Sequence, residues 1–169
     1  MLLRFICLTC ALGLISSGTA PAKPRWIVYP TGIGAMKIGM TRKQLSTVLH
    51  ESIKGPDTSD DKACYYTEVS SYPGVGLMIL NGRLARIDLN EPGTATEEGI
   101  QVGDSEAHIR AVYGHRVKIV PDAYESANHT LTLHSADGRT GIRFVIDQQK
   151  VRQFYAGRSD AIEYIEGCE

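Results

Sequence analysis

The feature that most constrains this chain is an internal repeat. The segment 38–49, IGMTRKQLSTVL, returns 64 residues later as the segment 102–113, VGDSEAHIRAVY. A second similarity links 76–79 to 141–144 at an offset of 65. Leu84 and Ile87 return as Val151 and Phe154, where the offset is 67. We attribute this increase in offset to a longer hairpin turn in the second copy. Repeated segments of this size indicate a supersecondary unit that has been duplicated and that stacks on its own copy.

Each copy begins with the pattern of a capped helix. In the first copy Thr41 occupies the N-cap position and Gln44 follows three residues later, which is the spacing of a capping box. In the second copy Ser105 takes the place of Thr41. Apolar residues spaced by three and four then predict one buried stripe on each short helix: Leu45, Val48 and Leu49 in the first copy, Ile109, Val112 and Tyr113 in the second.

After each helix the apolar period changes to two, which predicts strands at 64–69, 76–80, 83–89, 130–134, 141–146 and 151–155. Asn81-Gly82 is the typical pair for a type I′ hairpin turn, in which both residues need a positive φ. The alternation breaks at the same place in both copies, because the apolar residues Leu84 and Ile87 are spaced by three, as are Val151 and Phe154. We therefore expect a β-bulge or a bend at this place in each hairpin.

These elements predict a fold of the α+β class. It would consist of two tandem units, each a helix followed by an antiparallel meander, with the helices packed on one face of a sheet. The tail alternates apolar and acidic residues, which predicts a short edge strand. The expected segments are a signal peptide at 1–22, an N-terminal arm at 23–31, a first unit at 32–90, a linker at 91–99, a second unit at 100–160 and the tail at 161–169.

The first 22 residues are typical of a secretory signal peptide. Arg4 is followed by an apolar stretch at 5–15 that is too short to span a membrane. Cleavage after Ala22 fits the small-x-small rule, whereas the competing cut after Ala20 leaves a proline next to the scissile bond. Cys10, as a lipid acceptor, lacks a small residue before it. We expect a periplasmic or secreted protein whose mature form does not insert into the membrane.

Removal of that signal leaves two of the four cysteines, Cys64 and Cys168. An even pair in an exported chain predicts a disulfide. The alternative, a metal or redox pair, lacks the C-x-x-C spacing. The bond would tie the tail at 161–169 to the first unit.

Composition argues against several classes of partner. The formal net charge is −1, from 18 basic and 19 acidic residues, and no basic stripe or polybasic patch stands out, so we expect no nucleic-acid partner. His129 and His134 are five apart on a predicted strand and would face opposite sides. The acidic residues between 57 and 61 do not follow the order of a calcium loop. We expect no metal and no other cofactor.

Catalytic patterns are also weak. Gly103-Asp104-Ser105 is similar to the GDS motif of secreted lipases, which pair it with an Asp-x-x-His element near the C-terminus. No aspartate here precedes a histidine by three residues, and the repeat assigns Ser105 to the N-cap position of Thr41. We expect a protein without catalytic residues.

The tyrosines are the best indication of a binding surface. Tyr65 and Tyr66 are adjacent on a predicted strand, so they face opposite sides and one of them is exposed. Tyrosine suits interfaces because it combines a large contact area with a polar tip and little rotamer entropy. We take Tyr65, Tyr66 and Tyr155 as a possible binding surface, with partly buried strand tyrosines as the alternative interpretation.

Three resemblances bear on function. Ile38-Gly39-Met40-Thr41 and the capped helix after it resemble the opening of the SmpA/OmlA (BamE-type) envelope proteins. Two tandem copies with a disulfide resemble the secreted β-lactamase inhibitor proteins. The ending Tyr164-Ile165-Glu166-Gly167-Cys168 is similar to a family of small exported bacterial proteins of uncharacterised function.

These resemblances imply an exported, non-catalytic binding module. Its partner would be an envelope or secreted protein, and its role that of an inhibitor, an immunity protein or an assembly factor. Two alternatives from other classes remain. One is a carbohydrate-binding protein that uses exposed tyrosines and Trp26, and the other is a small envelope hydrolase with an unrecognised site.

Overall fold

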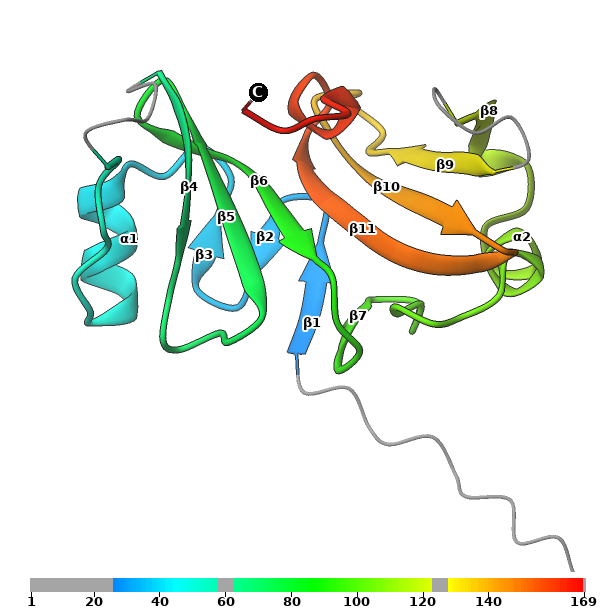
Figure 1. Ribbon diagram of the computed structural model, residues 1–169, viewed down its shortest axis with the longest axis horizontal. Helices are drawn as coiled ribbons and strands as arrows, with labels where there is room; N and C mark the ends of the chain where they lie inside the picture. Colours follow the sequence, from blue (N-terminus) through cyan, green and yellow to red (C-terminus); the bar gives the residue numbers. More distant parts are fainter. Residues whose placement is uncertain (1–25, 58–62, 123–127, 169) are drawn as a thin grey trace, which may run out of the picture.

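The computed structural model describes residues 26–57, 63–122 and 128–168, which form two β-sheets (Figure 1). The larger sheet has seven strands in the order β4-β5-β6-β11-β10-β9-β8, and every neighbouring pair is antiparallel. The smaller sheet has four strands in the order β3-β2-β1-β7. The predicted signal peptide at 1–22 lies outside the described residues.

The strands in chain order are β1 (Trp26–Tyr29), β2 (Gly32–Ile33), β3 (Met36–Lys37), β4 (Cys64–Glu68), β5 (Val75–Leu80), β6 (Arg83–Leu89), β7 (Thr94–Thr96), β8 (Lys118–Pro121), β9 (His129–His134), β10 (Thr140–Asp147) and β11 (Lys150–Arg158). The α-helices are α1 (Arg42–Leu49) and α2 (Glu106–Tyr113), and two short 3-10 turns are η1 (Gly114–Arg116) and η2 (Ala161–Glu163).

The predicted α+β class, with helices packed on one face of a sheet, is wrong. The described residues are mostly β, with 44% strand and 17% helix, and they contain only two short α-helices beside the two sheets. The difference has two physical sources. Each helix is only eight residues long, and segments that we assigned to an arm and a linker pair as additional strands.

The arm and the linker supply the smaller sheet. Residues 26–28 of β1 pair in parallel with 94–96 of β7, although these segments were predicted to be an irregular arm and linker. Parallel pairing between distant segments leaves no local pattern in the sequence. The predicted edge strand in the tail is also wrong, because 161–163 form the turn η2 and no strand follows up to residue 168. The strand β8, which contains Pro121, was not predicted.

The two units enter their hairpins through the same hydrogen bonds. In the first unit the Gly39 amide donates to the Leu84 carbonyl, and the Leu84 amide donates to the Met40 carbonyl, both at 2.8 Å. In the second unit the amide of residue 103 donates to the carbonyl of Val151 at 2.9 Å, and the Val151 amide donates to the carbonyl of residue 104 at 2.8 Å. The internal repeat is thus expressed as equivalent backbone contacts.

The two hairpin turns have equal length, contrary to our expectation. Asn81-Gly82 and Gln148-Gln149 are both two-residue turns, and all four residues have a positive φ, between 47° and 75°. The drift in offset arises earlier, between the first two strands of each meander. Thr67 pairs with Leu77 in the first unit, and 131 pairs with 144 in the second. The first strands of the two meanders are therefore 64 residues apart in sequence, whereas the second strands are 67 apart.

The predicted bulge or bend is a β-bulge in both hairpins. In the first hairpin the register shifts between Met78 and Ile79, which leaves Ala85 as the extra residue. In the second hairpin it shifts between Val145 and Ile146, which leaves Arg152 as the extra residue. The bulges explain why the apolar residues on β6 and β11 are spaced by three instead of two.

Each helix starts at a side-chain cap. Thr41 Oγ1 accepts a hydrogen bond from the Gln44 amide at 3.3 Å, and Gln44 Oε1 accepts one from the Thr41 amide at 2.9 Å. Ser105 Oγ accepts a bond from the His108 amide at 3.1 Å. The helices then bury Leu45 of α1, and Ile109 and Tyr113 of α2. These side chains join one core cluster with both sheets.

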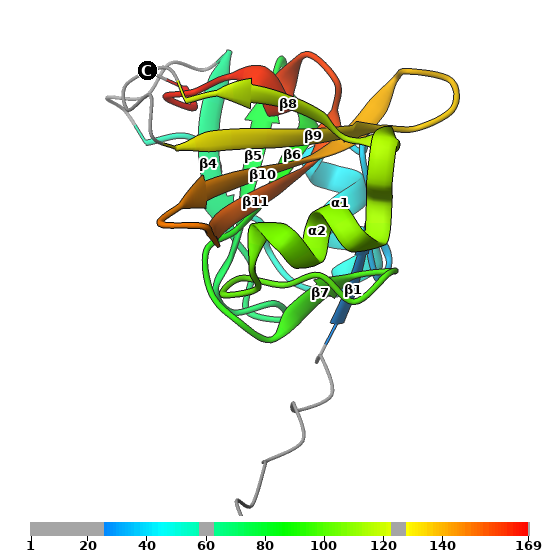
Figure 2. The same ribbon diagram turned by 90° about the vertical axis from the view of Figure 1, so that its right-hand side faces the viewer.

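We call the face of the seven-stranded sheet that joins this core the inner face, and the opposite one the outer face. Figures 1 and 2 show the smaller sheet and the helices on the inner side. The main cluster draws on alternate strand residues such as Leu77, Phe144 and Phe154. The intervening residues, among them Met78, Val145 and Tyr155, form separate smaller clusters on the outer face.

The predicted disulfide between Cys64 and Cys168 is confirmed, with a Cα–Cα distance of 5.4 Å and a sequence separation of 104 residues. The two half-cystines pack beside Met78, Leu80, Ala85 and Ala161. The bond therefore fixes the end of the chain to β4, at one edge of the seven-stranded sheet.

Candidate functional site

The candidate site lies on the outer face, beside the end of the chain. We call residues 159–168 the C-terminal segment. It follows β11 and lies across the upper part of the sheet (Figure 1, red). Ala161 and Ile162 are fully buried, Ala161 against Met78 and Ala85, and Ile162 against Val145 and Tyr155. The segment therefore divides the outer face into a covered part and an open part.

Arg86 holds the C-terminal segment in place. Its side chain is 2% exposed, and its guanidinium donates to both carboxylate oxygens of Asp88, at 2.8 and 2.9 Å. Nη1 donates to the backbone carbonyls of Ala161 and Tyr164, at 3.1 and 2.8 Å, and Nη2 donates to the Tyr66 hydroxyl. These contacts engage all five N–H groups of the guanidinium. A buried arginine so fully paired anchors the fold and is not left to bind a ligand.

Two of the three predicted surface tyrosines flank this arginine. Its guanidinium carbon lies 4.1 Å from the Tyr155 ring centroid and 6.0 Å from that of Tyr66. Burial, followed by the charge of Asp88, raises the pKa of Tyr66 to about 12. Burial also raises the pKa of Tyr155. The arginine itself stays charged, because Asp88 outweighs the burial that would by itself lower the pKa of Arg86.

The third predicted tyrosine is not part of this surface. Tyr65 is 6% exposed and lies in the main core, on the opposite side of β4 from Tyr66. Tyr66 is 41% exposed, and Tyr155 is 6% exposed beneath the C-terminal segment. Among the three, Tyr66 and Tyr155 share the outer face, and only Tyr66 presents substantial area to solvent.

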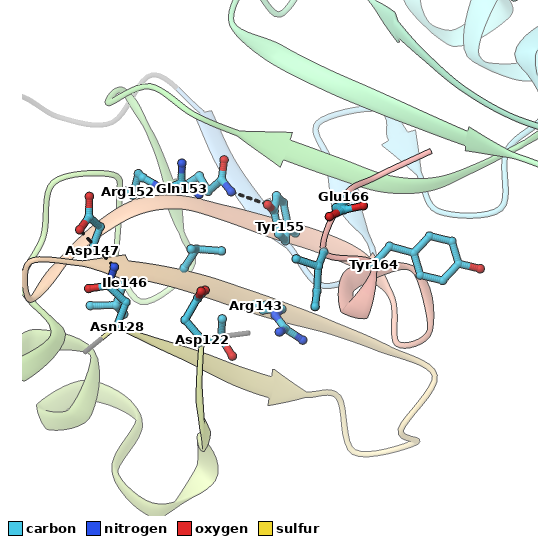
Figure 3. A pocket seen from close by; sticks show the side chains of 13 residues that line it. Asp122, Asn128, Arg143, Ile146, Asp147, Arg152, Gln153, Tyr155, Tyr164 and Glu166 are labelled. Atoms are coloured by element: carbon cyan, nitrogen blue, oxygen red, sulfur yellow. Dashed lines mark hydrogen bonds between the residues drawn. The ribbon is translucent and has the colours of Figure 1, made fainter. Parts of the chain in front are cut away.

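A cavity of about 300 Å³ opens on the outer face next to the C-terminal segment (Figure 3). Its apolar lining comes from Val145, Ile146 and Tyr155 in the sheet and Ile165 in the segment. Its polar lining is mixed: Asp122, Asn128, Thr130, Arg143, Asp147, Arg152, Gln153 and Glu166. Volume and lining are those of a small pocket for one side chain or a small polar molecule.

Three contacts organise the polar groups of this cavity. Arg143 is ion-paired with Glu163 of the C-terminal segment. The amide nitrogen of Asn128 donates to Asp147 at 3.3 Å, and the Gln153 amide donates to the Tyr155 hydroxyl. β10 and β11 therefore form the floor, and the C-terminal segment forms one wall (Figure 3).

Two exposed apolar side chains stand on that wall. Tyr164 is 40% exposed and Ile165 is 51% exposed, and both line the cavity. The backbone that carries them is restrained on both sides. Arg86 donates a hydrogen bond to the Tyr164 carbonyl, and Cys168 forms a disulfide with Cys64. Exposed apolar side chains on a restrained backbone lose little entropy on contact with a partner.

The other residues singled out in the sequence lie away from the cavity or stabilise the fold. Thr41, Gln44 and Ser105 lie at helix N-termini, as described above. His134 Nδ1 lies 3.1 Å from Ser159 Oγ, and the Ser159 hydroxyl donates to the Gly138 carbonyl at 2.7 Å. Within 26–57, 63–122 and 128–168, no group of three or more His, Cys, Asp or Glu residues is placed to hold a metal ion.

Sequence reasoning missed Arg86, Asp88, Tyr164 and the cavity. A usable signal was present, because Arg86 and Asp88 are two apart on a strand and therefore share a face. What was absent was any local sign that the C-terminal segment folds over that face.

Comparison with models of protein families, with curated proteins and with solved structures finds no match. The resemblances to the SmpA/OmlA and β-lactamase inhibitor proteins stay predictions. In the part of the chain that the structure describes, no helix is long and apolar enough to cross a membrane.

Proposed function

We propose that this chain is an exported, non-catalytic binding module that contacts an envelope or secreted protein through its outer face. The observation that carries the proposal is the apolar pair Tyr164 and Ile165, exposed beside a cavity and restrained on both sides. Such a pair matches the aromatic and aliphatic anchors that dominate the energetics of protein interfaces.

The surroundings of the pair favour a protein partner over a sugar. Sugar stacking needs an exposed aromatic face, and Tyr155, on the cavity floor, is 6% exposed with Arg86 over its ring. The ring of Tyr164 points away from the centre of the cavity (Figure 3). An inhibitor, an immunity protein and an assembly factor would all use a restrained surface of this kind.

Carbohydrate binding is a second candidate, and a different place supports it. The rings of Trp26 and Tyr72 lie 5.0 Å apart, and Trp26 lines another hollow of about 300 Å³ with Pro73, Leu89 and Glu91. Paired aromatic rings beside a carboxylate resemble a sugar platform. Both rings, however, also pack against the main core cluster, and this reduces the area left for a sugar.

Site-specific photo-crosslinking in the organism that produces the chain tests the proposal. A photoreactive phenylalanine analogue replaces Tyr164 in one strain and Ile165 in another. The matched control replaces Tyr29, which is 38% exposed on β1 in the other sheet. We expect one protein adduct from positions 164 and 165 and none from position 29.

Purified components complete the test. Tyr164→Ala and Ile165→Ala should each weaken binding of the crosslinked protein at least tenfold, whereas Tyr29→Ala should leave it unchanged. Glycan binding that depends on Trp26 without any protein adduct would favour the second candidate. Turnover of an envelope substrate by the pure chain would refute the non-catalytic assignment.

A further inference from the structure

The C-terminal segment is held in two different ways along its length. Up to Tyr164 it is fixed by noncovalent contacts with the sheet. Ala161 and Ile162 are fully buried, and Arg86 donates to the carbonyls of Ala161 and Tyr164. Past Tyr164, the described residues show no backbone hydrogen bond between 165–168 and the sheet. The two parts of the segment therefore depend on different interactions.

The disulfide is the strongest hold on residues 165–168. It joins Cys168 to the first residue of β4, a strand at the edge of the sheet. The noncovalent holds are an interaction of the exposed Glu166 and the packing of Gly167, where a Cβ would lie 2.7 Å from the Tyr66 hydroxyl oxygen. Contacts at an exposed surface contribute little beside a covalent bond. The bond therefore decides whether 165–168 stay in place.

The disulfide is also accessible from solvent. Cys64 and Cys168 are both partly exposed, and they pack against a small cluster on the outer face and not in the main core. Thiol–disulfide exchange begins when a thiolate attacks one of the two sulfurs, so its rate depends on such access. A dithiol reductant therefore reaches this bond without unfolding the chain.

We propose that the Cys64–Cys168 disulfide is a redox switch for the binding surface at Tyr164 and Ile165. One thiolate of a dithiol reductant attacks a sulfur of the bond and forms a mixed disulfide, which the second thiol of the reductant then resolves. The reductant supplies two electrons and two protons and becomes a disulfide, while Cys64 and Cys168 become thiols. Residues 165–168 are then released, whereas Arg86 keeps the Tyr164 carbonyl in place.

This release separates the two apolar side chains that we assign to binding. Ile165, 51% exposed on the cavity wall, loses its restrained position, whereas Tyr164 keeps its hydrogen bond to Arg86. A partner that binds both side chains must then order the released backbone again, and fixing even one residue lowers affinity about tenfold. The inference rests on the proposed function and adds its regulation: the oxidised chain binds, and the reduced chain binds at least about tenfold more weakly.

The kinetics of reduction test access to the bond. Dithiothreitol, a dithiol, is added to the folded, oxidised chain in native buffer, and free thiols are counted over time by alkylation and mass spectrometry. We expect the rate to rise in proportion to the dithiothreitol concentration. A rate that levels off at the global unfolding rate would show that the bond opens only in the unfolded chain, and this would overturn the inference.

Backbone relaxation of the amide nitrogens tests the release. After reduction we expect order parameters to fall at 165–168 and to keep their oxidised values at 161–164 and in the sheet. The matched control is the double variant Cys64→Ser with Cys168→Ser, which should show the same mobility with and without dithiothreitol. Unchanged order at 165–168 would contradict the switch. So would loss of order throughout the sheet, since the bond would then hold the whole fold.

Binding measurements separate this inference from the proposed function. The protein captured by crosslinking at position 164 is titrated with the oxidised chain and with the double serine variant, so that no reductant touches the partner. We expect at least about tenfold weaker binding by the variant. Equal affinities would reject the switch and leave the proposed function standing. Absence of any adduct in the oxidised chain would refute the proposed function, and the switch with it.

Discussion

The two halves of the molecule share a hairpin but use its outer face differently. At the offset of 67 that relates the hairpins, Arg86 and Asp88 of the first half correspond to Gln153 and Tyr155 of the second. Each pair interacts across one intervening residue. The first half carries a buried ion pair under the C-terminal segment, whereas the second half carries a neutral pair beside an open cavity.

This difference shows how a duplicated scaffold becomes asymmetric. The backbone hydrogen bonds that join each helix entry to its hairpin have stayed equivalent, since both cores depend on them. The outer face is free of that constraint, so its residues can diverge. Both copies hold the C-terminal segment, the first through Arg86 and the second through Val145 and Tyr155. Only the second copy also lines the open cavity. The predictions below test this division of roles, from the largest expected effect to the smallest.

The first prediction concerns the covalent tie on the covered half. Replacing Cys64 and Cys168 by alanine should destabilise the protein by about 4–5 kcal/mol in the chain-entropy model for a loop of about a hundred residues. Denaturant unfolding of the oxidised protein and the double variant measures this. Alkylation without reduction should label no thiol in the wild-type chain. A variant as stable as wild type would show that the bond does not secure the segment.

The second prediction compares the two equivalent pairs directly. Arg86→Met leaves the carboxylate of Asp88 buried without its partner and frees two carbonyls of the C-terminal segment, so we expect a loss of about 3–5 kcal/mol. Gln153→Met removes one neutral hydrogen bond and should cost about 0.5–1.5 kcal/mol. Chemical denaturation gives both values. Equal losses would contradict the assignment of an anchoring role to the first pair alone.

The third prediction concerns the caps, where the two halves should behave alike. Thr41→Ala and Ser105→Ala should each lower stability by about 0.5–2 kcal/mol, because each removes the acceptor for one free amide of a helix N-terminus. Thr41→Ala should have the larger effect, since it also disturbs a capping box that Ser105 lacks. Loss of a hydrolase activity in Ser105→Ala, with an unchanged melting temperature, would refute the structural role.

The fourth prediction is a pH dependence to which Tyr66 of the first half contributes. The folded-state pKa of Tyr66, about 12, lies above its ordinary value of 10. Its contribution to stability is therefore fully present below pH 10 and is lost as the pH rises through 12. Thr130, which pairs in β9 as Tyr66 does in β4, does not titrate.

Unfolding measurements from pH 9 to 12 test this. Tyr66→Phe should flatten the decline in stability relative to wild type, and the effect should be small because Tyr66 is 41% exposed. Thr130→Val is the matched control and should leave the slope unchanged. An unchanged slope in Tyr66→Phe would show that other groups govern the alkaline transition.

Local patterns in the sequence predicted the regular elements well. Asn81-Gly82, with a positive φ at both positions, forms the expected turn, and the three-residue spacing from Leu84 to Ile87 marks a bulge that the structure contains. Alternation on a strand also separates Tyr65 from Tyr66. Each of these features depends on residues that are close in sequence, where sterics and periodicity act directly.

The sequence offset between the two hairpins was harder to predict. A shift by two residues keeps every side chain on the same face of a strand, so the pattern cannot distinguish an offset of 65 from one of 67. Pairing across the strands resolves it, because Leu77 lies opposite Thr67 in the first unit and 144 lies opposite 131 in the second.

The candidate site could not be predicted in the same way. On β6, Arg86 and Asp88 occupy alternate positions that are typical of a solvent-exposed face. They are buried because the C-terminal segment, some 75 residues further along, returns over them and offers its carbonyls. Tyr164 belongs to a tail that we expected to form an edge strand, so its exposed position on a restrained turn was not foreseen.

The sequence by itself determined the repeat, the capped helices, the hairpins with their bulges and the cysteine pair, because propensity, alternation and turn chemistry act over a few residues. Only the tertiary structure decided the mostly-β class, the parallel pairing of β1 with β7 and the surface beside Tyr164. Those features depend on which distant backbone segments meet, and that is set by the burial of the whole chain rather than by any local pattern.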